Sequence, residues 1–255
     1  MNPLKKLIMS IDRRYLGSIF GKAQENKKLD YFESDLEYKI TTYYTKNMTD
    51  EIAQLCDLYG SDKGEIKSEG HPYAWPSHTY TDYYSQLFSH CRNDITKVFE
   101  CGLGTNNPEL LSSMGIHGKP GASLRVWRDY FPNAIIYGAD IDKDVLFEEE
   151  RIKTFYMDQL NPKSIKEYWE MVGEDNFDFM LDDGLHTFEA GSSLFNNSIG
   201  KLSKLGTYVI EDVLFEDLCR YKDFFRNSPY AVNYIVLNRP NLPLRDNNLV
   251  VIRKV

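Results

Sequence analysis

Cysteine is scarce in this chain of 255 residues, and its four copies are scattered. They are Cys56, Cys91, Cys101 and Cys219, and they form no C-x-x-C pair and no Cys/His spacing typical of a zinc site. The pattern gives no support for a structural zinc centre. It predicts reduced thiols in a cytoplasmic protein.

Basic residues are also fewer than acidic ones. Lysine and arginine total 30 against 38 aspartate and glutamate residues, which gives a net charge of -8 and a pI near 5.2. A nucleic-acid-binding protein needs a basic face to neutralise phosphates, so we expect no nucleic-acid partner. A small phosphorylated substrate stays compatible with this composition, because a local cluster of basic side chains would bind it.

Long apolar runs are missing, and no segment is long enough to cross a bilayer. Residues Met1–Lys22 mix apolar with basic side chains, and Ser10–Arg14 interrupts the apolar core that a signal peptide requires. We expect an amphipathic helix here that docks on the body of the protein or on a second subunit, as in a homo-oligomer. Peripheral membrane binding is the alternative.

What the chain does contain is a change of pattern near residue 90. Residues 1–90 favour helices, which predicts a helical N-terminal extension packed on the core. From residue 97 onward, apolar strands alternate with helices, which predicts a parallel sheet covered on both faces in a domain over residues 91–255. The expected strands are Lys97–Cys101, Ala134–Ala139, Ile152–Met157, Phe177–Leu181 and Thr207–Ile210, followed by an antiparallel hairpin of Ala231–Leu237 and Leu249–Arg253.

The stretch His71–Phe88 is rich in aromatic side chains. Such a run is typical of core packing between an added helical layer and a sheet, and this is the interpretation we favour. The alternative is that these rings line an acceptor pocket.

Two acidic pairs follow two of the expected strands. Asp182 and Asp183 end the first of these strands, with His186 close behind, and Glu211 and Asp212 end the second. Because the carboxyl ends of neighbouring parallel strands face one crevice, these side chains are expected to converge. Carboxylate oxygens suit Mg²⁺ or Mn²⁺, and a histidine beside such a metal is a plausible general base.

The alternative is that the acidic residues cap the helices that follow them. Capping explains one carboxylate per strand end but not two pairs together. Four like charges in one crevice would repel one another unless a cation neutralised them.

A glycine-rich segment follows the first expected strand, but it lacks one glycine. Gly102 and Gly104 fit the start of a dinucleotide fingerprint, whereas Asn107 stands where the third glycine belongs. A ligand with a ribose but no pyrophosphate fits better. Asp140 at the second strand end could accept the ribose hydroxyls, and Asp158-Gln159 at the third could meet an adenine amino group. Together they favour S-adenosylmethionine.

The order Glu100-x-Gly102-x-Gly104, Asp140, Asp158-Gln159, Asp182-Asp183-Gly184-x-His186 and Glu211-Asp212 resembles the class I methyltransferases. More narrowly it resembles the macrocin O-methyltransferase group of metal-dependent sugar O-methyltransferases, over roughly residues 55 to 215 and with support from Tyr59–Gly64, Gly121–Arg125 and Tyr130–Ala134. The resemblance implies an α/β, Rossmann-like fold whose seven-stranded sheet is mostly parallel, with the C-terminal antiparallel hairpin and the N-terminal helical extension.

The resemblance also implies roles for individual residues. Asp183, Glu211 and Asp212 would be ligands of a divalent Mg or Mn ion, and His186 would be the base. Cofactor binding would involve Ser61, Lys63, Glu100, Gly102, Gly104, Thr105, Ser123, Asp140, Ile141, Asp158, Gln159 and Asp182. The chain departs from the pattern at Leu185, where relatives often carry a small polar residue, and in the long loop Asn106–Ser123.

These observations predict an S-adenosylmethionine-dependent O-methyltransferase. Its expected acceptor is the hydroxyl of a small-molecule substrate, a nucleotide-linked sugar of glycan (capsule or lipopolysaccharide) or natural-product biosynthesis. Arg220, Lys222, Arg226 and Arg239 could meet the phosphates of such a sugar, or be ordinary solvated charges.

Three alternatives stay open. A catechol-like phenol or a small phosphorylated acceptor would suit the same enzyme class. A nucleotide-sugar enzyme with a nicotinamide cofactor would need a Tyr-x-x-x-Lys pair after the fourth strand, whereas the pair Tyr59 and Lys63 precedes the first. A non-catalytic binding protein with a degenerate fold is disfavoured by the intact acidic set.

Overall fold

The computed structural model describes residues 40–42, 44, 49–73, 75–238 and 244–255. The amphipathic helix predicted within Met1–Lys22 lies outside these residues. Within the described part of the chain, no helix is both long and apolar enough to span a membrane.

From residue 97 onward, strands mostly alternate with helices, as expected. The helices are α4 (Glu51–Tyr59), α5 (Tyr80–Phe88), α6 (Ala122–Tyr130), α7 (Pro162–Val172), α8 (Phe188–Ser198) and α9 (Phe215–Phe225), with 3-10 turns η1 (Lys143–Val145) and η2 (Ile199–Lys201). The strands are β1 (Lys97–Cys101), β2 (Ile135–Asp140), β3 (Glu148–Glu149), β4 (Ile152–Tyr156), β5 (Phe177–Asp182), β6 (Leu202–Ile210), β7 (Tyr230–Val236) and β8 (Asn248–Lys254).

The strands form one sheet in the order β3-β4-β2-β1-β5-β6-β8-β7. Neighbours from β4 to β6 pair in parallel, and β8 lies antiparallel between β6 and β7. The predicted fold class, a mostly parallel sheet with a C-terminal antiparallel hairpin, is confirmed. The sheet has one strand more than expected, because β3 contains two residues and is too short to show a periodicity in the sequence.

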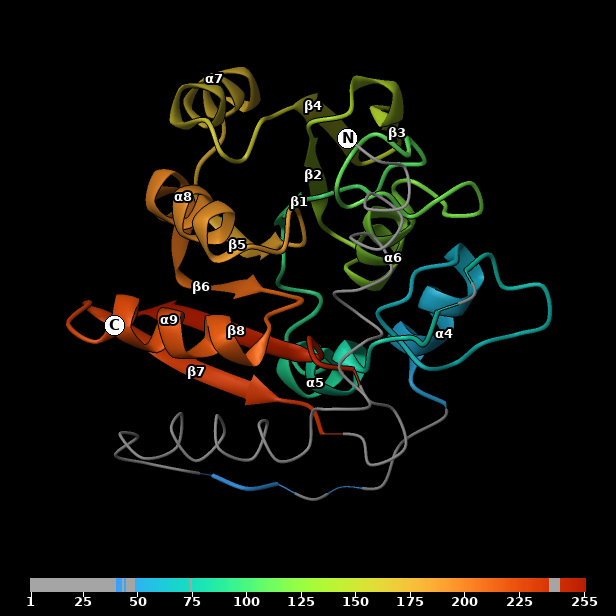
Figure 1. Ribbon diagram of the computed structural model, residues 1–255, viewed down its shortest axis with the longest axis horizontal. Helices are drawn as coiled ribbons and strands as arrows, with labels where there is room; N and C mark the ends of the chain where they lie inside the picture. Colours follow the sequence, from blue (N-terminus) through green and yellow to red (C-terminus); the bar gives the residue numbers. More distant parts are fainter. Residues whose placement is uncertain (1–39, 43, 45–48, 74, 239–243) are drawn as a thin grey trace, which may run out of the picture.

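Helices cover both faces of the sheet (Figure 1), and each face carries its own apolar layer. One core cluster joins the sheet to α7, α8 and α9, with Phe99, Tyr168, Leu194, Leu218 and Phe225 among its buried members. The other joins it to α4, α5 and α6, with Ile52, Tyr84, Phe88, Trp127 and Phe179 among its buried members. The described part of the predicted N-terminal extension therefore shares the core of the sheet domain.

The rings of α5 are packing residues, as favoured from the sequence. Tyr84 meets Trp127 edge-on at 5.5 Å between ring centroids, and Phe88 lies 4.8 Å from Phe179. The tyrosine hydroxyl groups of this helix have a second role at the edge of the sheet, described below.

Strand register brings the ends of the central strands to the same edge. Cys101 at the end of β1 pairs with both Ala139 and Asp182, and Asp182 pairs in turn with Ile210. The residues that follow these pairs are Asp140, Asp183 and Glu211. The sheet thereby gathers the predicted acidic residues into one place.

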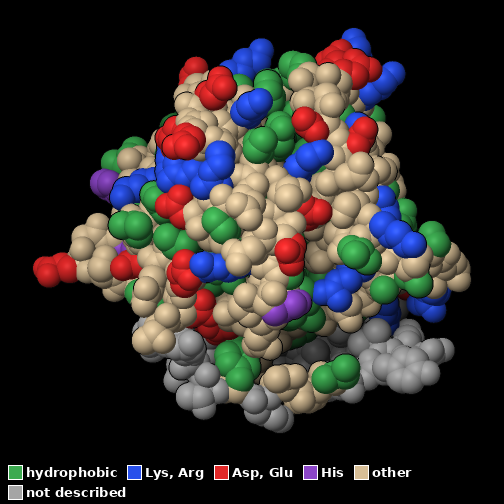
Figure 2. Space-filling model, turned by 180° about the vertical axis from the view of Figure 1, so that it is seen from behind, with side chains coloured by type: hydrophobic (Ala, Val, Ile, Leu, Met, Phe, Trp, Pro, Cys, Tyr) green, Lys and Arg blue, Asp and Glu red, His purple; other side chains and the backbone are tan. Residues whose placement is uncertain are grey.

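The face seen in Figure 2 carries acidic and basic side chains interspersed with one another. No broad basic area is visible on the described part of this face. This distribution agrees with the net acidic composition.

Candidate active site

The site lies at the carboxyl ends of β1, β5 and β6. Backbone pairing continues past the strands, because Asp183 N donates to Cys101 O at 2.8 Å and Glu211 N donates to Asp182 O at 3.0 Å. This extended pairing fixes where the two acidic pairs begin, so the side chains of Asp183 and Asp212 project from a rigid edge.

Gly102 makes the close packing of this edge possible. Its φ is +95°, and a Cβ at this position would lie 2.0 Å from the carbonyl oxygen of Asp183. Only glycine fits this position, because both the backbone conformation and the contact exclude a side chain. The glycine expected to let a ligand approach thus also lets the β1 loop approach Asp183.

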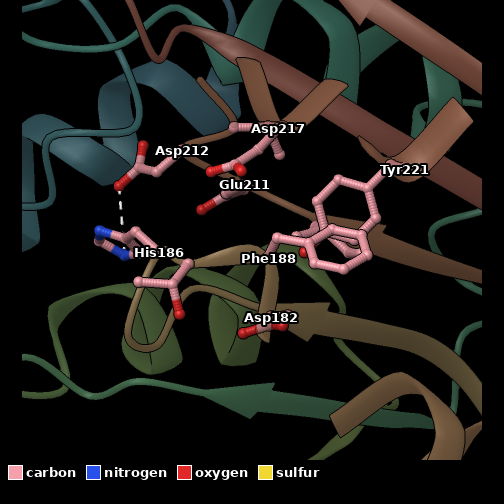
Figure 3. A pocket seen from close by; sticks show the side chains of 10 residues that line it. Asp182, His186, Phe188, Glu211, Asp212, Asp217 and Tyr221 are labelled. Carbon is pink, nitrogen blue, oxygen red and sulfur yellow. Dashed lines mark ion pairs between the residues drawn. The ribbon is translucent and has the colours of Figure 1, made fainter. Parts of the chain in front are cut away.

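Asp183, His186 and Asp212 form the centre of the site. Nε2 of His186 lies 3.1 Å from Oδ1 of Asp183 and 3.3 Å from Oδ2 of Asp212. One ligand atom from each of the three residues lies within 4.8 Å of the others. Figure 3 shows His186 and Asp212 facing each other from the two strand ends. The two carboxylates supply hard oxygen donors that fit a divalent cation such as Mg²⁺ or Mn²⁺, and the imidazole lies beside them.

Capping does not account for these acidic residues. The N-cap of α8 is Thr187, whose hydroxyl accepts from Ala190 N at 3.3 Å, and the N-cap residue of α9, Leu214, makes no side-chain capping bond. His186 and Asp212 both have a left-handed backbone, with φ of +55° and +54°. Such strain in non-glycine residues is typical of functional sites.

Lys63 is buried among three carboxylates. Its ammonium donates to Asp183 Oδ2 at 2.6 Å, forms a short contact with Glu211 Oε2 and lies 3.5 Å from Glu100 Oε1. Burial opposes the charge on Lys63, but the surrounding carboxylates outweigh it and hold the pKa of the ammonium well above its usual value. Lys63 is therefore a permanent cation inside the site.

Glu211 differs in its surroundings from the other predicted metal ligands. One of its oxygens contacts Lys63, and the other accepts from the hydroxyl of Tyr84 at 2.6 Å. Asp183 and Asp212, in contrast, each direct one oxygen to His186. In this geometry both oxygens of Glu211 are engaged by Lys63 and Tyr84, while one atom each of Asp183, His186 and Asp212 converges on a shared point.

Burial makes these carboxyl groups weak acids. It raises the pKa of Asp182 to about 6, of Glu100 to about 7 and of Glu211 to about 8, although nearby donors and the Lys63 ammonium partly oppose the last two shifts. Asp183 differs: burial is opposed by Lys63 and His186, and its pKa falls below the usual value. The site therefore holds several buried acid groups around Lys63, and a divalent cation among them would favour their ionised forms.

The predicted ribose-binding residue lies beside the glycine loop. Asp140 accepts from Leu103 N and from Asp142 N, each at 2.8 Å, and burial raises its pKa. Ile141 next to it is 47% exposed although it is apolar. The hydroxyl of Thr105 donates to the carboxylate of Asp142, and this bond links the glycine loop to the segment after Asp140.

The predicted adenine-binding pair splits into two roles. Asp158 accepts from Leu160 N at 3.0 Å and closes its own turn. Gln159 turns inward, donates to Asp182 Oδ1 at 2.6 Å and accepts from Leu185 N at 3.0 Å. The other oxygen of Asp182 is buried without a hydrogen-bond partner.

The remaining predicted residues surround Lys63 and Glu100. The hydroxyl of Ser61 accepts from Lys63 N at 3.4 Å and orders the loop that carries the lysine. Glu100 is fully buried, accepts from Trp127 Nε1 at 2.6 Å and lies beside the Ser123 hydroxyl. The structure thus brings the predicted residues of the first loop and of the acidic pairs to one edge.

Several known O-methyltransferases are similar to this chain in sequence. Demethylmacrocin O-methyltransferase of Streptomyces fradiae is 32% identical over 178 residues, which are 68% of this chain and 42% of that protein. Mycinamicin VI 2''-O-methyltransferase of Micromonospora griseorubida is 31% identical over 214 residues, which are 78% of this chain and 50% of that protein. The chain is a homologue of the macrocin-type sugar O-methyltransferases. It spans half or less of the length of these two relatives, and no protein-family model matches it.

Solved structures support the fold of the chain. MycE methyltransferase in complex with Mg, SAH and mycinamycin VI superposes with a TM-score of 0.58 and 22% identity, over 81% of this chain and 55% of that one. A second MycE structure, in complex with Mg and SAH, gives a TM-score of 0.57 and 24% identity, over 80% of this chain and 54% of that one. At this identity the likeness establishes the shared fold.

The site contains two tyrosines that the sequence did not reveal as contacts of the acidic residues. Tyr80 and Tyr84 lie four residues apart on one face of α5 and reach Asp212 and Glu211 respectively, each at 2.6 Å. The spacing of two tyrosines at i and i+4 just after His78 was the signal available in the sequence. The sequence could not show that their hydroxyls point at acidic residues more than 120 positions away.

His78 lies on the far side of Asp212 from His186. Its Nε2 is 3.2 Å from Asp212 Oδ1 and 3.5 Å from Asp246 Oδ1, and its ring stacks on Tyr80 at 4.8 Å. Burial opposes its charge, but the carboxylates of Asp212, Asp246 and Asp62 raise its pKa to about 10. His78 is therefore a cation that supports the carboxylate of Asp212.

Proposed function

We propose that this protein is an S-adenosylmethionine-dependent O-methyltransferase that acts on a sugar hydroxyl with the help of a divalent cation. The observation that carries the proposal is the convergence of Asp183, His186 and Asp212 directly beside the glycine loop of β1. The names of the homologues give the reaction class.

The cofactor would bind across the ends of β1, β2 and β4. Asp140 would accept the ribose hydroxyls, and Gln159 would exchange its contact with Asp182 for one to the adenine. Ile141 and Leu160 follow Asp140 and Gln159 in the chain, are 47% and 51% exposed, and would supply apolar contacts to the purine. Ser61, Lys63, Glu100 and Asp182 would surround the methionine part.

The cation would be held by the carboxylates of Asp183 and Asp212, with Glu211 adjacent. Such a cation lowers the pKa of a hydroxyl group that it contacts. His186 would accept the proton of the sugar hydroxyl while the oxygen takes the methyl group, and the sulfonium becomes the neutral thioether of S-adenosylhomocysteine. The chain itself mainly aligns oxygen, methyl carbon and sulfur.

The acceptor we favour is a sugar already attached to a natural product. One relative from Streptomyces olivaceus, 31% identical over 64% of this chain and 37% of that protein, is named for a rhamnosyl tetracenomycin acceptor. A nucleotide-linked sugar is less favoured, because two of the basic residues expected to meet its phosphates already have carboxylate partners. Arg220 pairs with Glu189 and Asp217, and Arg226 pairs with Asp223.

The first test measures binding of S-adenosylhomocysteine by calorimetry to chelated protein, with and without added Mg²⁺. Wild-type protein is expected to bind it, and Asp140→Ala is expected to lose that binding. Methyl transfer from S-adenosylmethionine to a panel of macrolide glycosides and nucleotide sugars, followed by mass spectrometry, then identifies the acceptor class. A protein that binds no S-adenosylhomocysteine under either condition would rule out the proposal.

A further inference from the structure

Tyr80 forms two hydrogen bonds with Asp212. Its hydroxyl donates to Asp212 Oδ1 at 2.6 Å and accepts from the backbone N–H of Asp212 at 3.1 Å. The hydroxyl has a single proton, and the carboxylate is closer than the other available acceptor, Asp246 O at 2.9 Å. One phenol thus fixes both the backbone and the side chain of a site residue.

These two hydrogen bonds are important because the backbone of Asp212 adopts an unfavourable conformation. Its φ of +54° is a conformation that residues with a Cβ rarely adopt. With Oδ1 held by Tyr80 and His78, the other oxygen is directed to His186 Nε2 at 3.3 Å. The left-handed turn and the two contacts on Oδ1 together determine which oxygen of Asp212 faces the centre of the site.

Tyr80 is itself anchored through its neighbour Thr79. Thr79 N donates to Asn247 Oδ1 at 3.0 Å, and Asn247 Nδ2 donates to Thr79 Oγ1 at 2.9 Å and to Leu237 O at 2.8 Å. These bonds join the start of α5 to the connection between β7 and β8. The ring of Tyr80 is 1% exposed and stacks on His78. The phenol therefore has little freedom to follow Asp212 if that residue relaxes.

We propose that Tyr80 is a positioning residue that sets the carboxylate of Asp212 for a divalent cation. This inference rests on the proposed function, because it assigns to Asp212 a share in binding the cation. Tyr80 acts through Asp212 and does not bind the cation. Residues that orient metal ligands typically change metal affinity by about 10- to 100-fold when they are altered.

The experiment compares Tyr80→Phe with Tyr83→Phe. Tyr83 is half-buried on the same helix and is not among the side chains that reach the acidic residues, so it controls for loss of a tyrosine hydroxyl from α5. Mn²⁺ affinity is measured from the electron paramagnetic resonance signal of free Mn²⁺, and S-adenosylhomocysteine affinity by calorimetry on chelated protein. Tyr80→Phe is expected to bind Mn²⁺ about 10- to 100-fold more weakly with unchanged S-adenosylhomocysteine affinity, and Tyr83→Phe to match wild type.

The outcomes separate the two proposals. If wild type binds S-adenosylhomocysteine but no Mn²⁺, the metal-dependent function and the role of Tyr80 both fail. If wild type binds Mn²⁺ and Tyr80→Phe binds it equally well, only the role of Tyr80 fails. In an Asp212→Asn background, Tyr80→Phe should cause no further loss of affinity, and an additive loss would contradict action through Asp212.

A second variant covers the case in which Tyr80→Phe does not fold. Thr79→Val removes the hydroxyl that accepts from Asn247 and loosens the anchor of Tyr80 while it leaves every side chain of the site in place. It is expected to weaken Mn²⁺ binding severalfold. Unchanged affinity in a folded Thr79→Val protein would overturn the inference.

Discussion

Lys63 donates to Asp183 at 2.6 Å, although the two residues are 120 positions apart in the sequence. The bond joins the loop after α4 to the end of β5, in the middle of the acidic site. Glu100 and Glu211 face the same ammonium. This one cation therefore supports the carboxylates of three different strand ends.

Removing this cation should destabilise the metal-free protein. In Lys63→Met, three buried acid groups lose their common partner, and breaking a buried ion pair typically lowers the free energy of unfolding by about 3–5 kcal/mol. Urea denaturation in the presence of a chelator measures the loss, and added Mg²⁺ should restore part of it. Lys163→Met is the control, because that side chain is 83% exposed and its pair with Glu167 contributes little. Equal urea midpoints for Lys63→Met and wild type would contradict this account.

The sequence predicted the sheet and the edge at which the site lies. Apolar runs ending in acidic residues are local patterns, and strand pairing converts them into neighbours, as the pair Cys101 and Asp182 shows. The prediction succeeded because parallel strands leave little freedom in where their ends meet.

The contacts of individual side chains could not be predicted in the same way. Asp158 and Gln159 are adjacent, yet one closes its own turn and the other enters the site. Tyr80 was expected as a packing residue, and its ring is one, but its hydroxyl reaches Asp212 across 132 positions. The direction in which a polar side chain points depends on tertiary packing, and the periodicity of a sequence carries no information about that packing.

The stability of the metal-free protein should fall as the pH rises from about 4.5 to about 8. Glu211 titrates near 4.5 when unfolded and, mainly through burial, near 8 when folded, so the folded state binds more protons in this window. The lowered pKa of Asp183 acts in the opposite sense, but below its usual value of 3.8 and thus outside the window. Chemical denaturation at several pH values measures the slope, and Glu211→Gln should reduce it, leaving the part that comes from the raised pKa values of Asp182 and Glu100. Equal slopes for Glu211→Gln and wild type would contradict the contribution of Glu211.

Gly102→Ala should disturb the loop that meets Asp183. Its added Cβ would lie 2.0 Å from the Asp183 carbonyl oxygen, in addition to the backbone penalty at φ +95°. Gly70→Ala separates the two effects, because Gly70 has φ +84° and a Cβ added there would meet no atom within 4 Å. We expect Gly70→Ala to cost about 1–2 kcal/mol in unfolding free energy and Gly102→Ala to cost more. S-adenosylhomocysteine binding should be lost only in Gly102→Ala. If Gly102→Ala retains binding, this loop does not contribute to the cofactor site.

His186→Ala should lower methyl transfer by about 10²- to 10⁴-fold, the usual contribution of a general base. Its affinity for S-adenosylhomocysteine should stay unchanged, because His186 contacts the acidic pair and lies outside the glycine loop. Mn²⁺ affinity then decides between two roles for the imidazole. Affinity equal to that of wild type supports the base, whereas a large loss would make His186 a ligand, since its Nε2 lies between Asp183 and Asp212. His117→Ala, in the exposed loop before α6, is the matched control and should retain full activity.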